Sequence, residues 1–193
     1  MKYKFFLPLL ALFLCVNALF AQLIPYGDSM DSVMVHYDYD SLKYAVYFYK
    51  PANYDSVNSP ILFGVHGNGG NGSAARYDLQ SIADRRKALI VTPTMPKLWD
   101  YGAEMISHAD SAIKCKSWYW LNFFMKDIYR YVLKKENRTS INLYLIGFSA
   151  GGQFVTRYML IRQGHPDSIP IQMAVSASPY FYTFCTDSLG GID

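Results

Sequence analysis

A Gly-x-Ser-x-Gly motif, Gly147–Gly151, places Ser149 directly after the short apolar run Leu143–Ile146. A sharp turn from a strand into a helix strains the backbone of such a serine and makes its hydroxyl project. The helix amino terminus that follows favours developing negative charge. The motif therefore predicts a nucleophile elbow with Ser149 as the nucleophile. The alternative is an ordinary helix start with Ser149 as its N-cap.

A second chemical signal is the glycine-rich segment His66–Gly70, which directly follows the apolar run Ile61–Val65. A loop of this kind, upstream of the elbow, is where an oxyanion hole takes its second donor. We expect the first donor to be the backbone N–H of Ala150. The second is that of Asn68 or Gly69, and the sequence leaves both open. A phosphate-binding loop is excluded because no Gly-Lys-Ser/Thr follows.

The remaining residues of the two motifs have supporting roles. We interpret His66 as a hydrogen-bonding element of its turn rather than as the catalytic base. Glycine allows the backbone to approach its neighbours without a Cβ clash. The glycines expected to support the elbow and the loop are Gly67, Gly147, Gly151 and Gly152.

The elements that must position these motifs alternate between strand and helix, which predicts an α/β fold with a mostly parallel central sheet flanked by helices. The strands expected to be buried on both faces are Ile61–Val65, Ala88–Val91, Leu143–Ile146 and Ile171–Val175. The expected helices are Ser73–Lys87, Ser117–Lys135 and Ala150–Arg162. Val33–Tyr39 and Tyr44–Tyr49 alternate as strands exposed on one face, joined by a turn at Asp40–Ser41, after a mobile start that reaches about Met30.

Together these residues resemble the α/β-hydrolase superfamily, and within it secreted esterases of the polyhydroxybutyrate depolymerase and feruloyl esterase type. The resemblance rests on a Val-Tyr-x-Tyr-x-Pro segment at Val46–Pro51, the His-Gly loop, and a Gly-x-Ser-Ala-Gly-Gly elbow. Its most specific parts are Ser149–Gln153 and Arg157–Tyr158. The resemblance implies hydrolysis of a small-molecule or polymer-linked carboxylic ester through a serine, without a cofactor.

A serine nucleophile needs a histidine and an acid, which follow it in this fold in the order Ser, acid, His. The only later histidine is His165, beyond a helix that runs about 20 Å away from the elbow, so it cannot be the base. Asp187 follows a buried strand on the side of the site and is the candidate acid. His108 also lies on that side, but its use would break the chain order.

We therefore expect residues 22–193 to be an incomplete hydrolase domain, truncated after its sixth strand, with an elbow and an oxyanion loop but no complete triad. In the family that the chain resembles, further strands and helices carry the acid and the histidine. Two alternatives stay open. The chain is a catalytically inactive, hydrolase-like binding protein, or it is a non-functional fragment.

The first 21 residues have the layout of a secretory signal peptide. Lys2 and Lys4 precede an apolar run, Phe5–Val16, and small residues lead to a cleavage position after Ala21. The run is shorter than the roughly 20 apolar residues that span a bilayer. The segment predicts a secreted or periplasmic protein with no stable membrane insertion after cleavage.

The composition limits the remaining function classes. The 193 residues are 51% hydrophobic, which excludes wholesale disorder, and the formal net charge is +3. Removal of the leader leaves the chain almost neutral, so no nucleic-acid partner is expected. No zinc-type spacing of Cys and His occurs, and no metal is expected. Cys115 and Cys185 either form a disulfide or are separate buried hydrophobes, and the sequence leaves both open.

Overall fold

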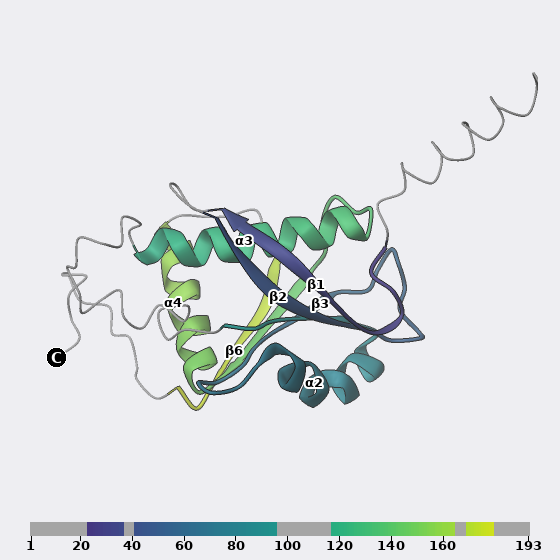
Figure 1. Cartoon of the computed structure of the whole chain (residues 1–193), viewed down its shortest axis with the longest axis horizontal. Helices are drawn as coiled ribbons and strands as arrows, with labels where there is room; N and C mark the ends of the chain where they lie inside the picture. The colour runs from purple at the N-terminus through teal and green to yellow at the C-terminus, as the bar shows by residue number, and fades with distance from the viewer. Residues whose placement is uncertain (1–22, 37–40, 96–116, 165–168, 180–193) are drawn as a thin grey trace, which may run out of the picture.

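The computed structural model describes residues 23–36, 41–95, 117–164 and 169–179, which form one sheet with helices on both faces (Figure 1). The strands are β1 (Gly27–His36), β2 (Ser41–Lys50), β3 (Ile61–Val65), β4 (Leu89–Pro93), β5 (Leu143–Phe148) and β6 (Ile171–Ala177). The helices are α2 (Gly72–Arg86), α3 (Ser117–Lys135) and α4 (Ala150–Gly164).

The described strands form a six-stranded mixed sheet in the order β1-β2-β4-β3-β5-β6. β1 and β2 are an antiparallel pair, and β2 is also antiparallel to β4. The pairs β3–β4, β3–β5 and β5–β6 are parallel. The prediction of a mostly parallel central sheet flanked by helices is therefore confirmed.

The hydrophobic core consists of two layers, one on each face of the sheet. All residues of β3 and β4 are buried, as expected for strands covered on both faces. On one face, Leu62 and Ile90 pack with Leu79 of α2. On the other face, α3 and α4 cover the sheet, and the side chains of α3 that recur at helical spacing are completely buried: Leu121, Met125, Ile128 and Val132.

The antiparallel end of the sheet differs from the prediction at the chain start. Residues up to about Met30 were expected to be mobile, but β1 begins at Gly27, which pairs with Lys50 of β2. Pairing along the whole of β2 satisfies the backbone of this polar segment, so alternating polar side chains can remain exposed. Ser41, predicted as part of a turn, is the first residue of β2.

Some predictions concern residues outside the described ranges. They are the leader at 1–21, the cysteines Cys115 and Cys185, the histidines His108 and His165, and Asp187. Within the ranges that are described, no helix combines the length and the apolar character needed to cross a membrane.

Candidate active site

Ser149 lies in the sharp turn between β5 and α4, and its φ is 55°. A residue with a Cβ adopts this left-handed conformation at a cost of about 1–2 kcal/mol. Two backbone hydrogen bonds hold it there: Ser149 N–H donates to the Ala177 carbonyl at 2.9 Å, and Gln153 N–H donates to the Ser149 carbonyl at 3.1 Å. The end of β6 and the first turn of α4 therefore hold Ser149 in this left-handed conformation.

The glycines around Ser149 permit backbone contacts that no other residue would allow. A Cβ added to Gly147 would lie 2.1 Å from the Gly151 carbonyl oxygen. One added to Gly151 would lie 2.1 Å from the Val65 carbonyl oxygen of β3, and one at Gly152 would lie 2.9 Å from the Ala177 carbonyl oxygen. The turn is thus pressed directly against the two neighbouring strands.

The glycine-rich loop lies beside the elbow because β3 and β5 are parallel and in register, with Val65 opposite Gly147. A Cβ on Gly67 would come within 3.2 Å of the Ser149 Cβ. Gly70 N–H donates to the Gly67 carbonyl at 3.1 Å and closes a turn in which Gly69 has a φ of 76°. The exposed Asn68 and Gly69 occupy the tip of that turn.

The two candidate donors in this loop keep their backbone N–H groups available. Neither Asn68 nor Gly69 donates a backbone hydrogen bond to any other described residue. The third candidate donor, Ala150, is the first residue of α4, where backbone N–H groups have no partner within the helix. The assignment of these groups to an oxyanion hole stays a prediction.

His66 is buried at the start of the loop, and both of its ring nitrogens are engaged. The Met95 backbone N–H donates to Nε2 at 2.9 Å, and Nδ1 lies 2.7 Å from the Gly67 carbonyl oxygen. Since a backbone N–H can only donate, Nε2 is unprotonated and Nδ1 carries the hydrogen. Burial also lowers the pKa of His66. These contacts support its interpretation as a hydrogen-bonding element of the turn.

Two features of the site were not predicted from the sequence. Phe148, at a variable position of the motif, is 61% exposed immediately before Ser149. Ser176 of β6 donates through its hydroxyl to the Gly152 carbonyl at 2.8 Å and ties the elbow helix to the sheet. Spacing in the sequence carried no signal for either, because Phe148 fills an unspecified position and Ser176 is brought to the elbow only by strand pairing.

The residues considered as partners of Ser149, Asp187 and His108, lie outside the described ranges. The other described histidine, His36, contacts Asp127 of α3 at 3.0 Å through Nδ1. Among the residues that the structure describes, no group of His, Cys, Asp or Glu side chains could hold a metal ion.

Comparison with known proteins shows similarity in structure and not in sequence. No protein-family model and no curated protein matches the chain. Poly(aspartic acid) hydrolase-1 from Sphingomonas sp. KT-1 matches with a TM-score of 0.64 and 21% identity, over 84% of this chain and 60% of that one. A poly(3-hydroxybutyrate) depolymerase from Bordetella parapertussis matches with a TM-score of 0.59 and 25% identity, over 80% of this chain and 53% of that one.

A bacterial heroin esterase also matches, with a TM-score of 0.50 and 15% identity, over 86% of this chain and 49% of that one. These similarities and the mixed six-stranded sheet show the α/β-hydrolase fold, and the resemblance to esterases of that fold is confirmed. The chain spans about 60% of the length of the first of these proteins and about half that of the other two.

Proposed function

We propose that this chain belongs to an exported serine hydrolase that cleaves carboxylic esters, with Ser149 as the nucleophile. The observation that carries the proposal is the conformation of Ser149. Its φ of 55° is maintained by contacts with both neighbouring strands, at the carboxyl edge of the parallel sheet. Open α/β sheets place their sites at this edge. Strain of this kind persists only where the surroundings enforce it, and it is concentrated at active sites.

The reaction follows from the positions of these groups. The Ser149 hydroxyl oxygen attacks the ester carbonyl carbon and gives up its proton to a general base, and the carbonyl oxygen becomes an oxyanion. Backbone N–H groups of Ala150 and of Asn68 or Gly69 donate to that oxyanion, each worth about 3 kcal/mol of barrier. The C–O bond then breaks as the base returns the proton to the departing alcohol oxygen. Water gives a proton to the base, attacks the acyl-serine and releases the acid, and the base restores the Ser149 hydroxyl. We propose Asp187 as the acid of the triad.

The proposed substrate is a small-molecule or polymer-linked ester. Support for this class comes from the names of two similar structures, a poly(3-hydroxybutyrate) depolymerase and a heroin esterase. Phe148 is exposed beside the nucleophile and offers an apolar surface to the acyl or alcohol part of the substrate. Export rests on the leader at 1–21, and amino-terminal sequencing of the native protein should begin at Gln22.

A fluorophosphonate probe tests the nucleophile, since it labels only an activated serine. We expect labelling at Ser149 by peptide mass spectrometry, and its loss in Ser149→Ala together with the hydrolysis of p-nitrophenyl acetate. Ser178→Ala is the matched control, because Ser178 also has a positive φ, of 45°, and follows β6. Labelling that persists in Ser149→Ala, or that is lost in Ser178→Ala, contradicts the assignment.

A second candidate function is that of a catalytically inactive, hydrolase-like binding protein. The observation in its favour is His66, the described histidine in the loop beside the elbow, which uses both ring nitrogens in hydrogen bonds. Folded protein that is not labelled by the probe, but whose melting temperature rises with an ester analogue, would support this function over hydrolysis.

A further inference from the structure

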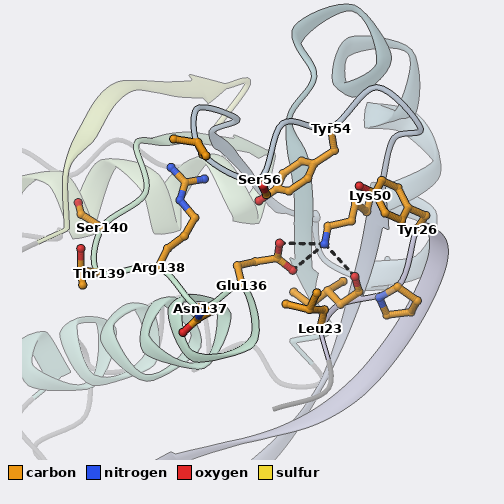
Figure 2. Close-up of a pocket in the computed structure, with 13 residues that line it drawn as sticks. Leu23, Tyr26, Lys50, Tyr54, Ser56, Glu136, Asn137, Arg138, Thr139 and Ser140 are labelled. Carbon is orange, nitrogen blue, oxygen red and sulfur yellow. Dashed lines mark hydrogen bonds and ion pairs between the residues drawn. The ribbon is translucent and has the colours of Figure 1, made fainter. Parts of the chain in front are cut away.

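Figure 2 shows a pocket of about 760 Å³. It lies at the amino end of β5, whereas Ser149 lies at the carboxyl end of that strand. Its walls come from three segments, residues 23–26, 50–57 and 136–140. The last of these precedes β5, whereas Ser149 follows β5. Six strand residues at about 3.3 Å each separate the two ends by roughly 20 Å. The pocket is therefore distinct from the candidate active site.

A buried ion pair forms one wall of the pocket and neutralises Glu136, the only carboxylate among the described residues that line it. Lys50 Nζ lies 2.9 and 2.8 Å from the two carboxylate oxygens of Glu136, and it donates to the Ile24 carbonyl at 2.9 Å (Figure 2). The three N–H groups of the ammonium are thereby used. Neither charge of this pair is left to bind a ligand.

Arg138 supplies a positive charge that this pair does not neutralise. Its Nη1 donates to the Ser59 carbonyl at 2.7 Å, and the guanidinium also lies close to the Tyr54 hydroxyl. With Lys50 and Glu136 balanced, Arg138 gives the lining of the pocket a charge of about +1. A guanidinium matches the geometry of a carboxylate.

Tyr54 adds a buried hydroxyl that lies close to the Arg138 guanidinium and the Glu136 carboxylate. The side chain is 7% exposed, and its hydroxyl is buried without a hydrogen bond. An unsatisfied buried group of this kind destabilises a protein by about 1–3 kcal/mol. Burial first, and then the negative charge of Glu136, raises the pKa of Tyr54 to about 12, so the hydroxyl keeps its proton. The ring extends toward the side of the pocket where Ser56 and Arg138 lie (Figure 2).

The rim of the pocket is apolar. Leu23, Tyr26 and Val57 all line it, and they are 55%, 62% and 71% exposed. Large apolar side chains that gather at one exposed place mark binding surfaces. Lys50 Nζ lies 5.2 Å from the centre of the Tyr26 ring, a cation–π contact that positions this ring before a ligand arrives.

We propose that this pocket binds a small organic carboxylate with an apolar body. The carboxylate accepts hydrogen bonds from Arg138 and from the Tyr54 hydroxyl, and the apolar body packs on Leu23, Tyr26 and Val57. Binding requires a rotation of the Arg138 side chain that opens the Tyr54 hydroxyl to the ligand. One unneutralised cation and an apolar rim favour a monocarboxylate over inorganic phosphate.

Calorimetric titration of the whole chain with benzoate tests the proposal. We expect saturable binding that is weakened about tenfold or more by Tyr54→Phe and by Arg138→Gln, because each variant removes a hydrogen bond to the charged carboxylate. Tyr54→Phe removes only an unpartnered hydroxyl, so its melting temperature should not fall. The controls are Tyr77→Phe and Lys134→Gln, at exposed positions outside the pocket, which should bind benzoate as the wild type does.

The ligand controls define the chemistry. Benzamide has the same ring without the charge, and it should bind at least tenfold more weakly than benzoate. The proposal is overturned if benzoate does not saturate, if benzamide or inorganic phosphate binds equally well, or if neither pocket variant weakens binding. Ser149→Ala should bind benzoate normally, so failure of this proposal and failure of the proposed esterase activity can be told apart.

Discussion

Different interactions hold the chain in place at the two ends of the parallel strands. At the carboxyl edge, Ser149 is strained and the surrounding glycines bring backbone within distances that any side chain would block. At the amino edge, two buried charges, Lys50 and Glu136, satisfy one another and the backbone of the entering chain. The comparison teaches that backbone geometry defines one end, whereas side-chain electrostatics defines the other.

The largest effect on stability is expected at the amino edge. Glu136→Ala leaves Lys50 buried without its counter-charge and should lower the free energy of unfolding by about 3–5 kcal/mol in urea titrations. The double variant Lys50→Met/Glu136→Leu removes both charges and should recover most of this loss. Lys134→Ala, at an exposed position, is the control. If Glu136→Ala destabilised the protein as little as Lys134→Ala does, electrostatics would not define this end.

The carboxyl edge should respond next most strongly, and to volume rather than to charge. Gly151→Ala places a Cβ 2.1 Å from the Val65 carbonyl oxygen and should destabilise the protein by about 3 kcal/mol. Gly27→Ala is the matched control, since its φ is 76° but nothing lies within 4 Å of the added Cβ. Its loss should be limited to about 1 kcal/mol of backbone strain. Equal losses in thermal unfolding would contradict the close-packing argument.

A smaller effect in the opposite direction is expected at Ser149, the proposed nucleophile. Ser149→Gly relieves the strain of a φ of 55°, although glycine also increases the entropy of the unfolded chain. The free energy of unfolding should therefore stay unchanged or rise by up to about 1 kcal/mol, while labelling by a fluorophosphonate disappears. A clear loss of stability would mean that the Ser149 conformation is not strained.

The smallest expected effect is the dependence of the free energy of unfolding on pH. Burial lowers the pKa of His66 below the ordinary 6.5, so below that pH the unfolded chain binds more protons than the folded one. Stability from this residue is therefore present above pH 6.5 and declines as the pH falls, by less than about 1 kcal/mol at pH 6. His66→Gln should flatten the dependence of stability on pH, as measured by urea titrations at pH 6 and pH 8, and an unchanged dependence would contradict this assignment.

Apolar runs predicted the positions of β3, β4, β5 and β6, and β3 and β4 are buried on both faces as expected. The same expectation was wrong for β6, where Met173 and Val175 are exposed, because in the described residues β6 has a neighbouring strand on one side only. The α3 helix was predicted with the bounds that the structure shows, Ser117–Lys135, because one stripe of its side chains lies against the sheet. The positions of Ser149 and of the His66–Gly70 loop could be predicted because glycine is obligatory there and glycine is visible in a sequence.

The features that were missed depend on contacts between distant segments. Lys50 and Glu136 belong to β2 and to the end of α3, and nothing in their spacing indicates that they pair. The error at the start of β1 has a similar cause. Its polar residues look unstructured until β2 provides a partner for their backbone. Local patterns identify elements, but they do not identify which elements meet.

The order of the strands determines when the candidate site can fold while the chain is being synthesised. Gly151 lies against Val65 of β3, and Ser149 N–H donates a hydrogen bond to the Ala177 carbonyl at the end of β6. Contacts between segments so distant in the chain form slowly, because the intervening loops must close first. On the ribosome the β1–β2 hairpin can pair early, whereas the conformation of Ser149 cannot be completed until β6 has emerged.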